Sequence, residues 1–353
     1  MRSAGIRGRI LARFSGSRGC TPGDELDISH MAEVDPRRPG RSEEMTGASD
    51  IAIARPARLL GRTVTICALA GAFLLATAAT ASADTALRFW HFNMCGAVIE
   101  APCNGGHDQP VSDAIKSSIE SYRPHAVSLN EACQSQWGTT YWNLNAAGVW
   151  TMGSRFVTTR YLGAPTATSR INCNLYDGNR RFGNALFSRQ AILLEPSATP
   201  LPKTQTTSET RRLWCMVVDL YRDTVYCTVH ITNYDDDIEE QIRTVATTVD
   251  QWVDDGIPVV LMGDFNVTPN DDRLDPIYHS SLGGGATGRF EEVDEYYNSS
   301  TRGRRGEATH PKGKIDYIFV SARDFYSVDG DATSSSYSDH VPLRGSATLD
   351  HTP

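Results

Sequence analysis

The sequence predicts an α/β (α+β) fold in which two packed, mixed or antiparallel β-sheets carry helices on their outer faces. Three features favour it. Apolar runs of strand length recur along the chain, helices with one apolar face lie between them, and the part after residue 83 contains no repeat or linker. Long antiparallel runs with interposed helices are typical of sheet-on-sheet packing covered by helices. About 270 residues are ample for a single large core.

Strands are expected wherever an apolar or alternating run of four to eight residues ends at a polar or turn-forming residue. These runs are residues 86–92, 126–129, a segment around Val157, 182–187, 213–220, 224–231, 259–263, 315–320 and 341–348.

Three helices are expected between these strands. Residues 110–122 place five apolar side chains on one helical face, and a second helix is expected at residues 134–147. The clearest helix begins at the acidic residues 235–237, which favour the positive end of the helix dipole, and ends at Gly256. Apolar residues recur at three- and four-residue steps between those limits.

The first 83 residues are not expected to belong to this domain. Residues 51–83 combine a basic flank, the apolar run 64–76 and the sequence Ala81-Ser82-Ala83, which together predict a secretory signal peptide. The apolar run is too short for a comfortable bilayer span, so we expect no stable membrane anchor. Residues 1–50 are polar and aperiodic, which predicts a disordered or untranslated extension. The folded domain is expected at residues 84–353, in a secreted, extracellular protein.

The charge balance is weak evidence about partners. The whole chain carries a formal net charge of −8. An acidic protein does not offer a generally basic surface to nucleic acid or anionic membranes, but it suits the binding of divalent cations.

Six cysteines follow the predicted cleavage site, and an even number in an exported chain predicts three disulfides. Two cysteines flank a hairpin, two would close a short loop and two remain, which gives the pairs Cys215–Cys227, Cys95–Cys103 and Cys133–Cys173. A zinc site is the alternative, but there is no paired C-x-x-C spacing.

The apolar run 259–263 ends in Asp264 and Asn266. Residues two apart on an extended backbone point the same way, so a carboxylate and a carboxamide are expected side by side at a rigid strand end. A plain turn is the alternative interpretation of this stretch.

Other predicted strands also end in acids, amides or histidines. The full set is Asn93, Glu131, Asn184, His230, Asp264, Asn266, Asp316, Asp339 and His340. Each residue alone has a simpler explanation, such as a surface histidine, a salt-bridge partner, a helix cap or a turn.

The set as a whole fits one chemistry. Glu131, with Asp264 or Asp339, supplies hard oxygen ligands for Mg²⁺ or Ca²⁺. His340 can accept a proton near neutral pH when an acid such as Asp316 orients it. The amides and His230 can hold phosphoryl oxygens. There is no G-x-S-x-G motif and no candidate reactive cysteine, so acyl transfer is disfavoured. Metal-assisted hydrolysis of a phosphate ester is the expected reaction.

Seven short motifs then carry a resemblance to a known family. In order, they are His91-Phe92-Asn93, Leu129-Asn130-Glu131, the run 183–189 (GNALFSR), Thr228-Val229-His230, Gly263-Asp264-Phe265-Asn266, the run 314–319 (KIDYIF) and Ser338-Asp339-His340. This series resembles the endonuclease/exonuclease/phosphatase superfamily, to which deoxyribonuclease I belongs. The resemblance implies a four-layered α/β sandwich with the site at one edge of the paired sheets.

The resemblance also implies roles for these residues. Glu131 is expected to be the principal ligand of Mg²⁺, with Asn93 beside it and Asp339 in support; Ca²⁺ or Mn²⁺ are the alternative ions. His340, oriented by Asp316, is expected to be the base that activates water. Asp264 and Asn266 would steer the nucleophile and the scissile phosphate, while His230 would contact a phosphate oxygen or assist the leaving group.

The sequence differs from the family motifs at one position and leaves one expected partner unidentified. Asn130 stands where many members of the family carry Gln, which is a conservative change. The acid that would orient His230 has no clear candidate in the sequence.

The sequence is least informative about the substrate. The basic loop 302–305, which includes Arg304, lies just before Asp316 and is expected either to grip phosphates or to be a solvated surface loop. Three aromatic residues, Trp137, Tyr141 and Trp142, are expected to stack on bases, to contact lipid headgroups or, for two of them, to join the core.

We therefore expect a monomeric, secreted, metal-dependent nuclease whose partner is nucleic acid. A sphingomyelinase-like phospholipid phosphodiesterase and an inositol-phosphate phosphatase are the alternatives of the same class. A non-catalytic binding module on the same fold is the alternative of a different class.

Overall fold

Two β-sheets form the centre of the domain in the computed structural model. The structure describes residues 84–98, 101–103, 108–148, 153–161, 173, 181–195, 198–204, 209–220, 222–335 and 337–351. The extension expected at residues 1–50 and the signal peptide expected at residues 51–83 lie outside these ranges.

The first sheet has the strand order β12-β13-β1-β2-β4-β3. Its strands are β1 (Thr85–Asn93), β2 (Ala126–Cys133), β3 (Ser154–Tyr161), β4 (Arg181–Ser188), β12 (Phe325–Ala332) and β13 (Leu343–Leu349).

The second sheet has the order β10-β11-β9-β8-β7-β5, and β6 also pairs with β7. Its strands are β5 (Ile192–Leu194), β6 (Thr199–Pro200), β7 (Arg212–Val218), β8 (Thr224–His230), β9 (Val259–Asp264), β10 (Phe290–Glu292) and β11 (Asp316–Ser321).

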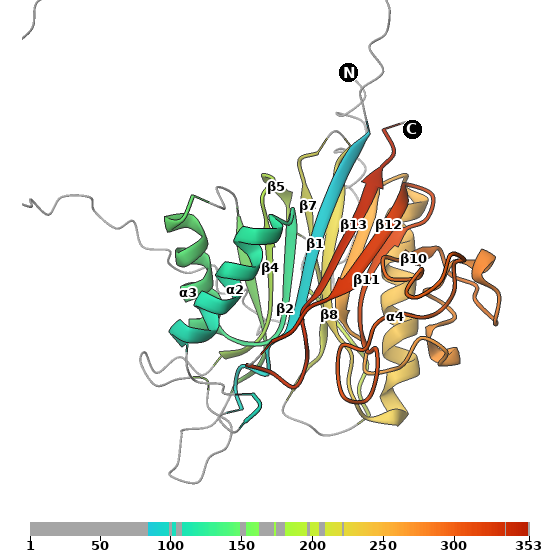
Figure 1. Cartoon of the computed structure of the whole chain (residues 1–353). Helices are drawn as coiled ribbons and strands as arrows, with labels where there is room; N and C mark the ends of the chain where they lie inside the picture. Colours follow the sequence, from blue (N-terminus) through green and yellow to red (C-terminus); the bar gives the residue numbers. More distant parts are fainter. Residues whose placement is uncertain are drawn as a thin grey trace, which may run out of the picture. The chain divides into compact units, whose positions relative to one another are not determined.

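The helices cover the outer faces of the two sheets (Figure 1). The helices α2 (Asp108–Tyr122) and α3 (Gln134–Ala146) lie on the first sheet, and α4 (Asp235–Asp254) lies on the side of the second. Two 3₁₀ helices, η1 (Asp272–Leu274) and η2 (Ser280–Leu282), follow β9. The predicted sandwich with outer helices is confirmed. Among the described residues, no helix is long and apolar enough to cross a membrane.

Alternation along the strands separates two layers of core. On β1, Leu87 and Phe89 face the other sheet and pack with Met216, Tyr226 and similar side chains. Trp90 and Phe92, whose side chains point to the opposite face of β1, pack instead beneath α2 and α3. Side chains that alternate across a strand therefore fill both the space between the sheets and the space under the helices.

The register of the strands brings the polar strand ends together. Parallel pairing places His230 of β8 beside Asp264 of β9, and antiparallel pairing places Asp316 of β11 on the other side of Asp264. In the first sheet, parallel pairing sets Asn93 of β1 beside Asn130 of β2. The ends of parallel strands share an edge, so each sheet delivers its polar residues to one edge of the sandwich.

Several elements differ from those expected, among them the short strands β5, β6 and β10, which were not predicted. The strand β2 continues to Cys133, beyond the expected end at Leu129, through a bulge that contains Glu131. The strand β12 was not predicted because it is a polar edge strand with glycine and aspartate in its sequence, and it pairs only with β13. Such edge strands lack the apolar signal on which strand prediction depends.

All three expected disulfides are present: Cys95–Cys103, Cys133–Cys173 and Cys215–Cys227. The last pair joins directly opposed residues of the antiparallel strands β7 and β8.

Gly263 allows the backbones of β8 and β9 to approach each other closely. A Cβ atom at this position would overlap the carbonyl oxygen of Val229 in the neighbouring backbone, which cannot move aside cheaply. We expect Gly263→Ala to lower the free energy of unfolding by about 1–3 kcal/mol, as over-packed core substitutions do. Chemical denaturation measures the change.

Gly138 provides the matched control. It lies in α3, and a Cβ atom there would meet nothing within 4 Å. Gly138→Ala is expected to stabilise the protein by about 0.5–1 kcal/mol, because alanine loses less entropy in a helix. Equal effects of the two substitutions would contradict the close approach at Gly263.

Candidate active site

A chain of buried side chains links the two sheets at their shared polar edge. Asp316 is its central carboxylate: Oδ2 accepts a hydrogen bond from His340 Nδ1 at 2.7 Å, and Oδ1 lies 3.1 Å from His91 Nε2. His91 is fully buried, and its Nδ1 lies 3.0 Å from the hydroxyl of Ser128. The two histidines, from β1 and from the loop before β13, therefore hold Asp316 from both sides.

Asp264 is the second centre of the cluster. Its Oδ2 accepts a hydrogen bond from Asn93 Nδ2 at 3.0 Å and lies 3.5 Å from His230 Nε2 and 3.7 Å from His340 Nε2. Its Oδ1 accepts the backbone N–H of Asn266 at 2.9 Å. A single buried carboxylate thus contacts four of the residues selected from the sequence.

Glu131 lies at the open side of this cluster. Asn93 Nδ2 also donates to Glu131 Oε1 at 3.1 Å, so one amide connects the carboxylates of the two sheets. The side chain of Glu131 is 27 % exposed, whereas that of Asp264 is 2 % exposed. Glu131 is therefore the more accessible of these two carboxylates.

Glu131 and Asn266 have φ angles of 53° and 55°. Non-glycine residues rarely adopt this left-handed conformation, which costs about 1–3 kcal/mol and is concentrated at functional sites. At Asn266 the conformation directs Nδ2 to the carbonyl oxygen of Ile231 at 2.9 Å and to within 3.4 Å of His230 Nε2.

The acids and bases of the cluster have divergent pKa values. Burial and the charge of Asp316 raise the pKa of Asp264 to about 7. Burial lowers the pKa of His340, but the charge and hydrogen bond of Asp316, together with Asp264 and Asp339, outweigh it and raise this pKa to about 10. Burial also raises the pKa of Asp316, but the charge of His340 and the bonds from both histidines hold it below its ordinary value.

These shifts bear on the expectation that His340 is the base that activates water. A pKa of about 10 favours the imidazolium form of His340 at neutral pH, and in that form the ring is a hydrogen-bond donor. Asp264 is the group whose pKa lies near neutrality, and this is the condition for a general base. Burial and the nearby Arg211 lower the pKa of His230, which is therefore neutral.

The remaining predicted residues lie at different distances from the cluster. Asp339 Oδ2 lies 3.6 Å from His310 Nε2, and ligand atoms of His310, Asp339 and His340 lie within 4.8 Å of one another. Asn184 is buried on β4 near the bulge that holds Glu131, and its Nδ2 finds no hydrogen-bond partner among the described residues.

Arg304 is not brought into the cluster. Its guanidinium donates to the carbonyl oxygens of Pro269 at 2.7 Å and Asp271 at 2.5 Å, pairs with Asp275 and covers the ring of Tyr278. Only 7 % of its side chain is exposed. This placement gives Arg304 a structural role and does not support the predicted phosphate contact.

Two of the three aromatic residues after Glu131 join the core, which was one of the alternatives expected from the sequence. Trp137 and Tyr141 pack against the core beneath the helices, whereas Trp142 is 60 % exposed.

Sequence reasoning missed the part played by His91 in this site. It belongs to the first motif, but its own position inside a strand gave no sign that it bonds Asp316 across the sandwich. We expect His91→Leu to lower kcat by about 10- to 100-fold with little change in KM, because Asp316 loses one of its two orienting bonds. Steady-state kinetics on any phosphodiester that the wild-type enzyme hydrolyses measures kcat and KM separately.

His351→Leu is the matched control for His91→Leu. His351 bonds Thr85 at the opposite end of β1, and its loss is expected to leave kcat unchanged. An unaltered kcat in His91→Leu would show that Asp316 does not need the second histidine.

The donor set of the cluster fits a hard divalent cation. The carboxylates of Glu131, Asp264 and Asp339, with an amide oxygen or water, are the ligands that Mg²⁺, Ca²⁺ or Mn²⁺ prefer. Ligand atoms of Asp264, Asp316 and His340 also lie within 4.8 Å of one another. Burial and the negative charge of Asp316 raise the pKa of Asp264, and a bound cation would oppose this rise.

Comparison with solved structures gives several matches to this fold. An endonuclease/exonuclease/phosphatase from Beutenbergia cavernae is 22 % identical, with a TM-score of 0.54, over 75 % of this chain and 72 % of its own. The catalytic domain of human nocturnin with bound sulfate is 16 % identical, with a TM-score of 0.54, over 75 % and 94 % of the two chains. A mannosyl-6-phosphatase from Bacteroides thetaiotaomicron is 14 % identical, with a TM-score of 0.54, over 74 % and 99 %. At these identities the likeness establishes the fold.

The sequence itself matches a family model. No curated protein matches the chain. The model of the Endonuclease/Exonuclease/phosphatase family matches residues 91–340, which include His91, His340 and every residue of the cluster between them. This protein therefore belongs to the endonuclease/exonuclease/phosphatase family, whose members are hydrolases of phosphate esters.

Proposed function

We propose that this protein is a divalent-metal-dependent phosphodiesterase that cleaves nucleic acid, with Mg²⁺ as its ion. One observation carries the proposal. A base of suitable pKa, an imidazolium and an accessible carboxylate meet at one edge of the sandwich in Asp264, His340 and Glu131. This combination serves phosphoryl transfer, which depends on positioning and on stabilising negative charge.

In the proposed reaction, Asp264 accepts the proton of the attacking water, whose oxygen bonds to phosphorus as the bond from phosphorus to the leaving oxygen breaks. The leaving oxygen takes its proton from solvent. His340 donates from Nε2 to a phosphoryl oxygen, while its Nδ1 remains bonded to Asp316. Asn266 and Asn93, whose amides border the same carboxylate, orient the water and the phosphate. His230 is neutral and serves as a hydrogen-bond partner of a phosphate oxygen.

The ion would be held by Glu131 with Asp339 and Asn93 in support. When bound, it neutralises charge that develops on the phosphoryl oxygens and the leaving oxygen. Ca²⁺ and Mn²⁺ prefer the same class of oxygen ligand and are the alternative ions.

Nucleic acid is favoured over phospholipid by the exposed side chains. Among the described residues, the large exposed apolar side chains are all Trp or Tyr: Trp142, Tyr234, Tyr296, Tyr297 and Tyr326. Such rings stack on bases, whereas insertion into a bilayer requires a contiguous apolar patch.

A substrate panel tests the proposed function. Purified protein with Mg²⁺ is incubated with plasmid DNA, RNA, sphingomyelin and inositol phosphates, and products are separated by gel electrophoresis or chromatography. Cleavage of DNA or RNA, lost in Asp264→Asn, is the expected result. Cleavage of sphingomyelin alone would reject the nuclease in favour of a phospholipid phosphodiesterase. Absence of turnover on every substrate would favour a non-catalytic binding module.

We further propose that the protein is exported. The three disulfides support this, because such bonds persist mainly in oxidising compartments. Protein recovered from the culture medium is expected to begin at Asp84 by N-terminal sequencing. Recovery only from the cytosol, with free thiols, would contradict export.

A further inference from the structure

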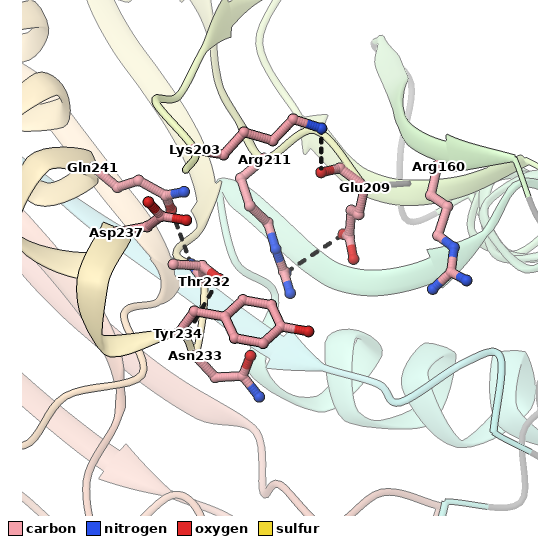
Figure 2. A pocket seen from close by; sticks show the side chains of 9 residues that line it. All are labelled: Arg160, Lys203, Glu209, Arg211, Thr232, Asn233, Tyr234, Asp237 and Gln241. Atoms are coloured by element: carbon pink, nitrogen blue, oxygen red, sulfur yellow. Dashed lines mark hydrogen bonds and ion pairs between the residues drawn. The ribbon is translucent and has the colours of Figure 1, made fainter. Parts of the chain in front are cut away.

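A basic pocket lies beside the cluster and plays no part in the chemistry proposed above. It has a volume of about 100 Å³ and is lined chiefly by Arg160, Lys203, Glu209, Arg211 and Tyr234. Arg160 comes from β3 of the first sheet, whereas Arg211 precedes β7 of the second, so the pocket spans the two sheets. Figure 2 shows both guanidinium groups and the Tyr234 ring projecting into the same space.

The pocket is continuous with the catalytic edge. Its lining residue Thr232 follows His230 by two positions, and Asn266 Nδ2 bonds the intervening carbonyl of Ile231 at 2.9 Å. The charge of Arg211 is also close enough to oppose the rise that burial causes in the pKa of Glu131 and to add to the fall that burial causes in the pKa of His230. The pocket therefore lies beside His230 and Asn266, two of the residues proposed to contact the cleaved phosphate.

The walls of the pocket are fixed by hydrogen bonds that cross between elements. Thr210 N donates to Thr159 O at 2.9 Å, and Thr159 Oγ1 donates to Glu209 Oε1 at 3.0 Å, which ties the two sheets together behind the arginines. Gln241 of α4 accepts from Thr232 N at 2.9 Å and donates to Pro202 O at 2.8 Å. A pocket built in this way needs little ordering when a ligand enters.

Two of its cationic groups retain donors that no described residue accepts. Nε of Arg160 and Nη1 of Arg211 are buried without a hydrogen-bond partner among the described residues, although Nη1 lies 3.5 Å from Glu209. Three cations and the two carboxylates Glu209 and Asp237 leave one net positive charge in the lining. Buried guanidinium donors without acceptors are costly unless a ligand supplies the acceptors.

We propose that this pocket binds a second phosphate of the substrate, next to the phosphate that is cleaved. A phosphate offers several acceptor oxygens and a negative charge, and the planar guanidinium fork matches it. Tyr234, which is 48 % exposed at the rim, gives a flat face for a base or sugar attached to that phosphate. This inference rests on the proposed function, and it assigns to the enzyme substrates that carry at least two phosphates. The second phosphate is either the next one in a strand or a terminal phosphate of a short nucleotide.

Kinetics on three matched substrates tests the pocket. The dinucleotide dTpdT has one phosphate, its terminally phosphorylated form has two, and the trinucleotide dTpdTpdT has two within a strand. Wild-type enzyme is expected to show at least a tenfold higher kcat/KM on one or both two-phosphate substrates. In Arg160→Gln most of that advantage, about tenfold or more, is expected to be lost, mainly through KM. The substrate that shows the advantage identifies the source of the second phosphate.

Arg155→Gln is the matched control on the same strand. Arg155 is paired with Glu195, is 47 % exposed and is not part of the pocket lining, so its loss is expected to leave all three rates unchanged. Arg160→Lys, which keeps the charge, is expected to restore part of the advantage. Equal losses on dTpdT and on the two-phosphate substrates in Arg160→Gln would overturn the proposal.

A binding measurement separates this proposal from the proposed function. Calorimetric titration of the metal-free protein with inorganic phosphate is expected to show binding that weakens at least tenfold in Arg160→Gln and Arg211→Gln. Phosphate binding that is unaffected by both substitutions would overturn the pocket even if the enzyme cleaves DNA. Absence of turnover on every substrate, with intact phosphate binding in the pocket, would overturn the proposed function alone.

Discussion

His340→Gln is expected to lower kcat by about 10²–10³-fold and to remove the alkaline limb of the pH–rate profile. The magnitude is that of losing one preorganised donor to a developing oxyanion. Asp264→Asn is expected to cost about 10²–10⁴-fold and to remove the acidic limb, because the proton acceptor is lost. These are among the largest effects that single substitutions in this protein should have.

The order of the two limbs follows from the pKa values. Asp264 must be deprotonated to accept a proton, so the rate rises as pH passes through its pKa of about 7. His340 must be protonated to donate, so the rate falls as pH passes through its pKa of about 10. A bound dication lowers both values, since it stabilises the negative and opposes the positive form, but it leaves each limb assigned to the same residue.

Profiles of kcat/KM from pH 5 to pH 11 at saturating Mg²⁺ decide between the two candidate bases. If His340 were the base, as the family resemblance first suggested, His340→Gln would remove the acidic limb instead. His125→Gln is the matched control, because His125 lies just before β2, at the end of the strand opposite Glu131. It is expected to leave both limbs in place.

The residues of this site could be predicted from the sequence, whereas their pKa values could not. Asp264, Asp316 and His340 were found because polar residues ended apolar strands. Their pKa values depend on register: β9 lies between the parallel β8 and the antiparallel β11, so Asp264 shares its level with both His230 and Asp316. Pairing of this kind joins residues about 35 to 50 positions apart and leaves no mark in the local sequence.

Arg304 and Arg160 also show that the local sequence does not indicate whether an arginine faces a substrate site. Arg304 lies in a basic run, but Asp275 and two backbone carbonyls some 30 positions away take up its guanidinium. Arg160 lies on an ordinary strand with no local motif, yet the packing of the sheets sets it beside Arg211. Local composition indicates charge, whereas tertiary contacts decide whether that charge faces a substrate.

The metal proposal makes the other large prediction: EDTA should abolish turnover, and Mg²⁺ should restore it. Glu131→Gln is expected to lower kcat/KM by about 10²–10³-fold at a fixed low Mg²⁺ concentration, because a neutral amide is a much poorer ligand of a hard cation. Glu131 is the accessible carboxylate of the cluster, and Asn93 holds its Oε1 in place. High Mg²⁺ is expected to recover part of the loss.

Binding of the ion can be followed without turnover. A ligand that binds only the folded state raises the unfolding free energy, by about 2.7 kcal/mol at 100 times its Kd. Mg²⁺ is therefore expected to raise the Tm of the wild type, and less so that of Glu131→Gln. It should also release protons near pH 7, because it opposes protonation of Asp264, whose pKa is about 7.

Glu120→Gln separates site binding from general charge effects. Glu120 is a partly exposed residue of α2 that pairs with Lys116, so its substitution removes the same charge at a distance from the cluster. Its Mg²⁺-dependent rise in Tm is expected to equal that of the wild type. Turnover that survives EDTA, together with a Mg²⁺ response that is identical in Glu131→Gln and Glu120→Gln, would require a metal-independent reaction, in which His340 alone would have to offset the charge on the phosphate.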